Sequence, residues 1–149
     1  MPNWCMNDAT LRHDDPAVVK ETIAKLEKME EYHLFRTLDP EWEYREAHDV
    51  DWGHDSDMTE ISLNFASAWS PPEELYETLE EQGWTVWATY YEPGMAIAGM
   101  FVDGEMNEFD DIHDIEEEWV DNDPILKEVV EHWAIWDEIE MLREMDEEE

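Results

Sequence analysis

The sequence predicts an α+β fold, in which a four-stranded antiparallel sheet carries two helices on one face. Three observations lead to this prediction. Apolar and polar residues alternate in the segments expected to be strands, and apolar residues recur at spacings of three and four in those expected to be helices. The segments follow one another as strand, helix, strand, helix, strand, strand, which favours a sheet with its helices gathered on one side.

The first strand and the first helix are expected near the N-terminus. Residues 4–13 have no helical pattern and are expected to be extended. Asp15 then places an N-cap residue directly before Pro16, at the first helical position. Apolar side chains follow at helical spacing, at Val19, Ile23 and Leu26. We therefore expect a helix from about Pro16 to Glu30.

The central part of the chain predicts a loop, a strand and a second helix. Residues 31–57 mix aromatic and acidic side chains without a regular period, so we expect an irregular loop there. Residues 61–66 alternate apolar and polar side chains as a half-buried strand does. Ser70 and Glu73 stand at the spacing of a capping box, which predicts a helix that starts there and runs to about Gln82.

A β-hairpin is expected next. Residues 84–91 are rich in aromatic and β-branched side chains, which are frequent in strands. Pro93 and Gly94 predict a turn, and residues 95–102 predict the second strand, which ends at Asp103-Gly104.

The last third of the chain is about twice as acidic per residue as the rest. Residues 1–102 hold 22 acidic and 6 basic side chains, whereas residues 103–149 hold 21 and 2. This step in charge predicts a compact α+β domain at residues 1–104, followed by an acidic helical extension at residues 105–149 that packs on the domain or projects from it. A length of 149 residues suits one domain with such an appendage.

Two helices are expected in the extension. Residues 110–119 predict a short helix, and Asp123 before Pro124 predicts the start of a longer one that runs to about Met145. Apolar side chains form a broad stripe along the longer helix. Val129, Trp133 and Trp136 widen this stripe beyond one ordinary contact face, so they are candidates for a dimer or partner face, with core packing as the alternative.

The net charge limits the classes of partner. The chain has 43 Asp and Glu against 8 Lys and Arg, which gives a formal net charge of −35. Nucleic acids and anionic membranes are bound by basic patches, so the charge excludes direct binding to either and favours basic partners or cations. The chain is nevertheless expected to fold, because 42% of its residues are hydrophobic and nine are Trp.

The compartment follows from cysteine usage and from the lack of membrane signals. Cys5 is the single cysteine, which excludes an internal disulfide and suits a reducing compartment. No run approaches 18 apolar residues, and the first residues lack a signal-peptide pattern. We expect a cytoplasmic protein.

Five short motifs follow one another in the first two thirds of the chain: Pro2-Asn3-Trp4-Cys5-x-Asn7, Trp52-Gly53, Ala68-Trp69-Ser70-Pro71-Pro72, Tyr90-x-Glu92-x-Gly94 and Ala98-Gly99. In this order they resemble the YubB ferredoxin-like domain family, over about residues 2–104. The resemblance implies a ferredoxin-like fold, an origin in phages or plasmids, and no established catalytic activity. For a phage-encoded protein, the cytoplasm would be that of the host. The acidic residues beyond 104 lie outside the family pattern.

No constellation of residues predicts an enzyme. Imidazole and carboxylate groups crowd into the segment 48–57, but the glycine and terminal glutamate of a calcium-binding loop are missing, so a solvated acidic loop is preferred to a metal site. Cys5 lies in an expected strand, where a buried thiol is ordinary. Ser70 is better explained as a helix cap than as a nucleophile, since no Gly-x-Ser-x-Gly elbow surrounds it. We expect no catalytic residue, no metal and no cofactor.

The acidic side chains are the candidate partner-binding residues. Those of the extension are Glu105, Glu108, Asp110, Asp111, Asp114, Glu116, Glu117, Glu118, Asp121, Glu128, Glu131, Glu138 and Glu140. Those of the central loop, as second candidates, are Asp49, Asp51, Asp55 and Asp57.

These acids predict a nucleic-acid mimic of phage type. Fixed carboxylates would occupy the Lys and Arg side chains of a basic groove in a host defence protein, such as a restriction or CRISPR component, or in the transcription apparatus. One alternative is a salt-adapted or generally acidic protein without mimicry. Another is a scaffold or chaperone for basic clients, which would tolerate many partners.

Overall fold

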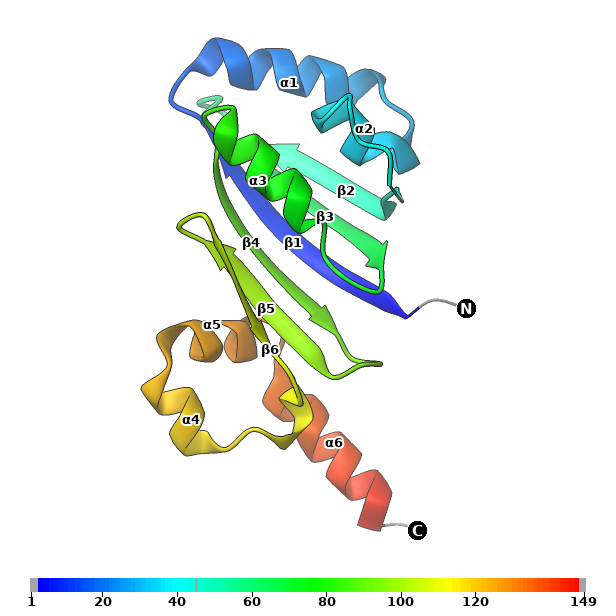
Figure 1. Ribbon diagram of the computed structural model, residues 1–149, viewed down its shortest axis with the longest axis vertical. Coiled ribbons are helices and arrows are strands. Elements are labelled where there is room, and N and C mark those ends of the chain that lie inside the picture. The colour runs from blue at the N-terminus through cyan, green and yellow to red at the C-terminus, as the bar shows by residue number, and fades with distance from the viewer. Residues whose placement is uncertain (1–2, 45, 148–149) are drawn as a thin grey trace.

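A six-stranded antiparallel sheet forms the centre of the computed structural model, which describes residues 3–44 and 46–147 (Figure 1). Its strands lie in the order β2-β3-β1-β4-β5-β6. Their bounds are β1 Trp4–Arg12, β2 His48–His54, β3 Glu60–Ala68, β4 Thr85–Glu92, β5 Ile97–Val102 and β6 Glu105–Phe109.

The helices pack on both faces of this sheet. Their bounds are α1 Pro16–Lys28, α2 Leu34–Leu38, α3 Glu73–Glu81, α4 Glu117–Asn122, α5 Pro124–His132 and α6 Ile135–Glu147, with 3₁₀ turns at Glu31–His33 and Ile112–Asp114. Figure 1 shows α1, α2 and α3 on one side of the sheet and α4, α5 and α6 on the other. The α+β class predicted from the sequence is confirmed.

The central strands and the first helix form where the sequence predicts them. β1 and β3 pair along their whole lengths, with Ala9 opposite Leu63, and each strand alternates buried and more exposed residues. The Asp15 side chain accepts a hydrogen bond from the amide of Ala17, so the expected N-cap of α1 is confirmed. The apolar side of α1 meets the sheet through Val19, Ile23 and Leu26.

The first face of the sheet carries the larger hydrophobic core. Leu11 of β1, Leu63 of β3 and Val86 of β4 lie buried there against α1, α2 and α3. Phe35 of α2 packs edge-on against Phe65 of β3, with the ring centroids 5.2 Å apart.

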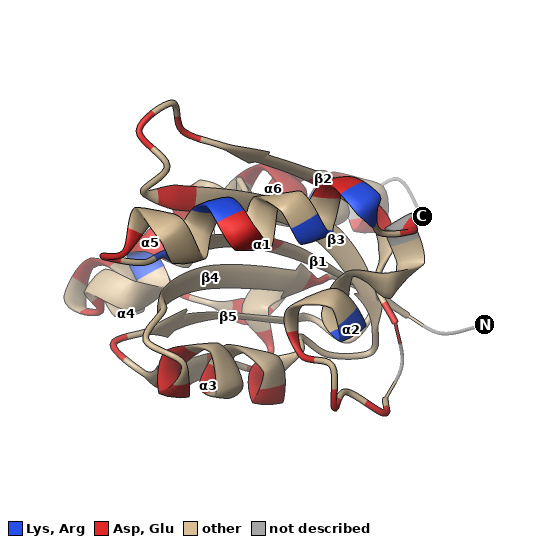
Figure 2. Cartoon of the chain, turned by 90° about the horizontal axis from the view of Figure 1, so that it is seen from above, with Lys and Arg blue, Asp and Glu red and all other residues tan. Residues whose placement is uncertain are grey.

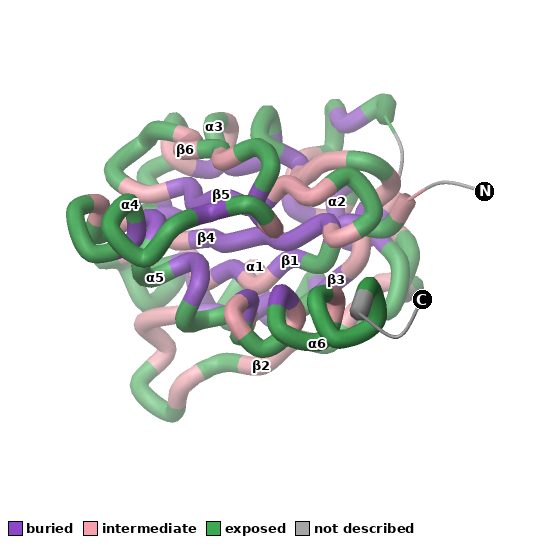
Figure 3. Tube along the Cα trace, turned by 90° about the horizontal axis from the view of Figure 1, so that it is seen from below, coloured by how far each residue is buried: buried purple, intermediate pink, exposed green. Residues whose placement is uncertain are grey.

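The second face carries a separate core over β4 and β5. Val129 and Val130 of α5 and Ile139 of α6 are buried there against Tyr91 and Met100 of the sheet. Figure 3 shows buried backbone along β4 and β5, with exposed residues on α4 and the outer side of α6. The C-terminal helices therefore form a second layer on the face of the sheet opposite to α1 and α3.

The sheet has two more strands than the four expected. β2 lies within the segment expected to be an irregular loop, and β6 lies within the expected helical extension. Both are edge strands, and a register shift between His48 and Asp51 interrupts the pairing of β2. Neither strand shows the strict alternation of β1, because an edge strand contacts the core along only part of its length.

The boundary expected at residue 104 falls inside the hairpin of β5 and β6. Asp103 and Gly104 both have positive φ, at 53° and 77°, which is typical of a type I′ two-residue turn. Val102 pairs with Glu105 directly across this turn. The first residues of the expected extension therefore continue the sheet.

Two details of the expected helices are wrong. α3 starts at Glu73 with Pro72 as its N-cap, and no side chain caps it, so Ser70 and Glu73 do not form the expected capping box. The long helix expected from Asp123 to Met145 is divided into α5 and α6 at Ala134, whose φ is 51°. That left-handed residue interrupts the helical hydrogen bonds and gives α6 its own direction.

Candidate acidic interface

Most of the acidic residues expected to bind a partner lie at the surface. Twelve of the thirteen candidates after residue 104 are exposed, and Glu138 is half-buried. Seven of the candidates lie within residues 110–121, a stretch with no Lys or Arg. We call this stretch the acidic segment; it contains the 3₁₀ turn Ile112–Asp114 and most of α4.

Buried apolar side chains hold the acidic segment in place. Ile112, Ile115 and Val120 point into the second core, and each is at most 6% exposed. The amide of Ile112 donates a hydrogen bond of 2.8 Å to the carbonyl of Ala96, which ties the segment to the β4–β5 turn. The carboxylates between these anchors are therefore carried on a fixed backbone, which lowers the entropy lost when a partner binds.

Two of the candidate acids have structural partners within the chain. Glu108 accepts a hydrogen bond of 2.5 Å from the hydroxyl of Tyr90, and Glu138 accepts one from the hydroxyl of Tyr91. Burial raises the pKa of both tyrosines, and the neighbouring carboxylates raise it further. These two hydrogen bonds link β4 to β6 and β4 to α6. Glu108 and Glu138 are therefore less free than their neighbours to pair with a partner.

The acids of the central loop lie apart from those of the extension. Asp49 and Asp51 are exposed on β2, and Asp57 is exposed in the turn that follows. β2 and β6 occupy opposite edges of the six-stranded sheet, which places them about 24 Å apart at the usual strand spacing. The structure therefore does not bring the two sets of candidates together.

Asp55 has a role within the β2–β3 turn. Its carboxylate accepts hydrogen bonds from the amides of Thr59, at 2.8 Å, and Glu60, at 3.1 Å, and a further one from the Thr59 hydroxyl. The hydrogen bond from the Thr59 side chain lowers the pKa of this carboxyl most strongly. Asp55 is thus a turn residue rather than a free binding group.

The candidate dimer or partner face is largely an internal contact. Val129 is fully buried, and the indole N–H of Trp133 donates a hydrogen bond of 3.0 Å to the hydroxyl of Thr89 on β4. Trp136 is half-buried against the same core. The stripe is wide because it covers the sheet, so its interpretation as a partner face is wrong for Val129 and stays a prediction for Trp133 and Trp136.

The acids of α3 were not among the expected binding residues. Glu73, Glu74, Glu77 and Glu81 recur at helical spacing and are exposed, and Figure 2 shows acidic residues along this helix. Burial raises the pKa of Glu73, and Glu77, Glu108 and Glu74 raise it further. The spacing alone would have predicted this acidic helix face.

Basic side chains gather elsewhere. Three lysines, Lys20, Lys25 and Lys28, lie on α1, which also carries Glu21 and Glu27 (Figure 2). Residues 105–147 hold 18 acidic and 2 basic side chains. The molecule therefore has a strongly negative helical layer on one face of the sheet and a nearly neutral helix on the other.

The structure offers no metal centre within its described part: no three His, Cys, Asp or Glu side chains there lie close enough together to hold an ion. In that same part, every helix is too short or too polar to cross a membrane.

Comparisons with protein-family models, with curated proteins and with solved structures found no match for this chain.

Proposed function

We propose that this protein is an acidic mimic of nucleic acid, which inhibits a host defence or transcription protein by occupying its basic nucleic-acid-binding groove. The observation that carries the proposal is the anchored acidic segment. Its backbone is held by the buried side chains of Ile112, Ile115 and Val120, while its seven acidic side chains face solvent. A frayed acidic tail would lose more entropy on binding than this segment does.

The amount of charge matches that of a short stretch of duplex. The twelve exposed candidate carboxylates after residue 104 equal the phosphate charge of about 20 Å of B-DNA. Phosphate contacts supply most of the nonspecific affinity of DNA-binding proteins, so a carboxylate surface competes for the same Lys and Arg side chains without copying any base. The net charge of −35 also speeds the encounter with a basic partner at low salt.

We propose in addition that residues 4–92 form a ferredoxin-like unit of the YubB type. Their main elements follow as β1-α1-β2-β3-α3-β4, with the strands in the order β2-β3-β1-β4. This is the βαββαβ plait. The edge strand β2, absent from the sequence-based prediction, completes the plait. An origin in a phage or plasmid, as the motif resemblance implies, fits an inhibitor of host defence.

General acidity or salt adaptation is the second candidate, because the acids extend beyond the C-terminal layer. Glu77 and Glu81 on α3 lie on the opposite face of the sheet from the acidic segment, and no basic groove could contact both sets at once. A solvating surface needs only total charge, whereas mimicry needs charge at one place.

A pair of charge-reversal variants separates these two functions. The first changes Asp110, Asp114, Glu117 and Glu118 of the acidic segment to Lys, and the control changes Glu21, Glu27, Glu77 and Glu81 of α1 and α3 to Lys. All eight residues are exposed, and each variant moves the formal charge from −35 to −27.

The assay is affinity capture from host lysate, followed by displacement of the captured protein with duplex DNA and with rising salt. Mimicry predicts that the control retains one nucleic-acid-binding protein, that DNA displaces it, and that the first variant does not capture it. Equal behaviour of the two variants, or capture that DNA does not reverse, would contradict the proposal.

A further inference from the structure

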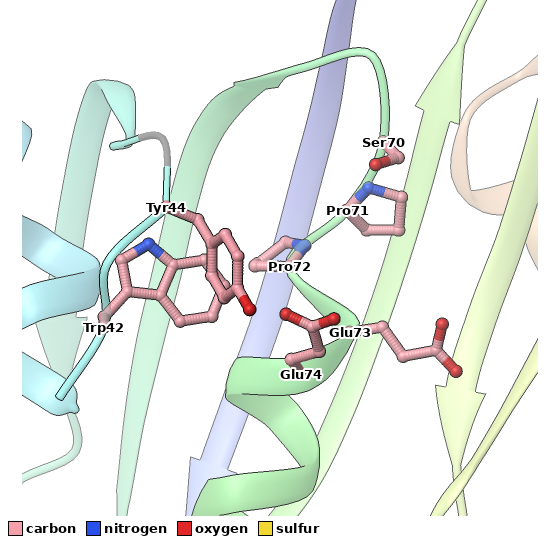
Figure 4. Close-up of a pocket in the computed structure, with 7 residues that line it drawn as sticks. All are labelled: Trp42, Tyr44, Ser70, Pro71, Pro72, Glu73 and Glu74. Carbon is pink, nitrogen blue, oxygen red and sulfur yellow. The ribbon is translucent and has the colours of Figure 1, made fainter.

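A hollow of about 480 Å³ opens on the first face of the sheet, away from the acidic segment. Its walls come from two stretches that are distant in sequence. Trp42 and Tyr44 belong to the connection between α2 and β2, and residues 70–74 form the β3–α3 connection and the first turn of α3 (Figure 4). The volume lies within the range of ordinary ligand sites.

The aromatic wall of the hollow is held in place by the core. Trp42 is only 8% exposed and packs edge-on against Phe35, with centroids 5.3 Å apart. Tyr44 packs edge-on against Trp42, with centroids 5.2 Å apart and an interplanar angle of 77°, and is 64% exposed. The hollow thus has a fixed indole and an accessible phenol ring, while Pro71 and Pro72 add two further apolar surfaces.

Among the described residues that line the hollow, carboxylates are the only fully charged groups. None of the seven lining residues is basic, and two of them are Glu73 and Glu74. Figure 4 shows the Glu74 carboxylate directed toward the hydroxyl end of Tyr44, with the Glu73 carboxylate directed away from the two aromatic rings. An aromatic ring with a carboxylate beside it provides the two contacts that a flat cation uses.

The electrostatic surroundings favour a cation at this place. The N-terminus of α3 contributes about half of a positive charge, which two carboxylates in its first turn exceed. The neighbouring Glu77 and Glu108 add negative potential, consistent with the raised pKa of Glu73. A bound cation would relieve the repulsion among these acids.

We propose that the hollow binds an arginine side chain of a protein partner, whose guanidinium stacks on Tyr44 and pairs with Glu74. Arginine fits better than lysine, because its planar, delocalised group combines ring stacking with a forked hydrogen bond to a carboxylate, whereas an ammonium is a compact, strongly hydrated charge. The proline surfaces would contact the methylene groups of the side chain. The inference goes beyond the proposed function and does not rest on it, since the hollow and the acidic segment lie on opposite faces of the sheet.

The test is an NMR titration of the full chain with the peptide acetyl-Gly-Arg-Gly-amide, followed through the indole N–H of Trp42 and the amide of Tyr44. Parallel titrations use the peptides with lysine and with citrulline, the neutral isostere of arginine. We expect millimolar binding of the arginine peptide, with the largest shifts at these two residues. We expect affinity about tenfold lower for citrulline and several-fold lower for lysine.

Two matched variants separate the hollow from general acidity. Glu74→Gln removes the carboxylate beside Tyr44, and Glu81→Gln removes an equal charge about 10 Å further along the same helix. We expect the first to lower affinity for the arginine peptide about fivefold and the second to change it less than twofold. Tyr44→Ala should also weaken binding, and because this ring is mostly exposed the fold should survive.

Several results would overturn the inference. Citrulline binding as tightly as arginine would remove the role of charge, and tighter binding of the lysine peptide would remove the role of the guanidinium. Equal losses in Glu74→Gln and Glu81→Gln would reduce the effect to overall charge. An absence of shifts at Trp42 and Tyr44 at peptide concentrations up to about 20 mM would show that the hollow binds no such group.

Discussion

Val129 offers the sharpest test of how the C-terminal layer relates to the rest of the protein. Its side chain lies on α5, is fully buried and belongs to the core on the second face of the sheet. Val129→Ala removes two methyl groups, which costs about 1.6 kcal/mol of transfer free energy. A residual cavity adds to this, for a total loss of about 2–3 kcal/mol in the free energy of unfolding.

The consequence of this substitution is measurable by urea unfolding followed by both tryptophan fluorescence and far-UV circular dichroism. The urea midpoint should fall accordingly. In a separate thermal unfolding experiment on this chain of 149 residues, the same loss should lower Tm by about 5–10 °C. Because both cores share β4 and β5, we expect one coincident transition by the two probes. Glu128→Ala, at an exposed position on the same helix, is the control and should change stability by less than about 0.5 kcal/mol.

Two results would refute this reasoning. A loss below about 0.5 kcal/mol in Val129→Ala would mean that α5 does not hold the sheet. A separate early transition that removes helical signal alone would mean that the C-terminal layer unfolds independently, as an appendage would.

Two further predictions concern single contacts. Trp133→Phe removes the indole donor and leaves the buried hydroxyl of Thr89 with one contact fewer, so the free energy of unfolding should fall by about 1–2 kcal/mol, and an unchanged urea midpoint would contradict the contact. Glu73→Gln should stabilise the protein at pH 7. The pKa of Glu73 is raised in the folded state, so its ionisation destabilises the fold as the pH rises from the pKa of an ordinary glutamate to the pKa in the folded state. The gain should vanish in urea titrations below the pKa of an ordinary glutamate, whereas a constant gain at every pH would point to a cause other than charge.

Regular alternation made the interior of the sheet predictable. β1, β3 and α1 contact the core along their length, so their patterns carry period two or the helical spacing, and the predictions for these elements held. The edge strands β2 and β6 contact the core along only part of their length, and the sequence alone did not reveal them. Missing β2 also hid one edge of the sheet, since that strand pairs with β3.

The position of the acidic layer was not predictable from charge. The step in composition near residue 103 is real, but the chain continues through a tight turn into β6 and then folds back over the sheet. The wide apolar stripe on α5 and α6 contacts large residues of β4, such as Tyr91. The hollow on the first face joins Trp42 and Tyr44 to Pro71 and Pro72, and no local pattern indicates such a distant contact.

The charged edges of the sheet have a consequence for solubility. An edge strand presents unpaired backbone groups that can pair with another molecule, and carboxylates along the strand oppose this by repulsion. Asp49 and Asp51 lie on β2, and Glu105 and Glu108 lie on β6, so both edges are protected in this way. Neutralising these four carboxylates would remove this protection at both edges at once. Each molecule would then have two edge strands whose unpaired backbone groups can pair with another molecule. Two such edges allow open-ended growth of an aggregate rather than a closed dimer.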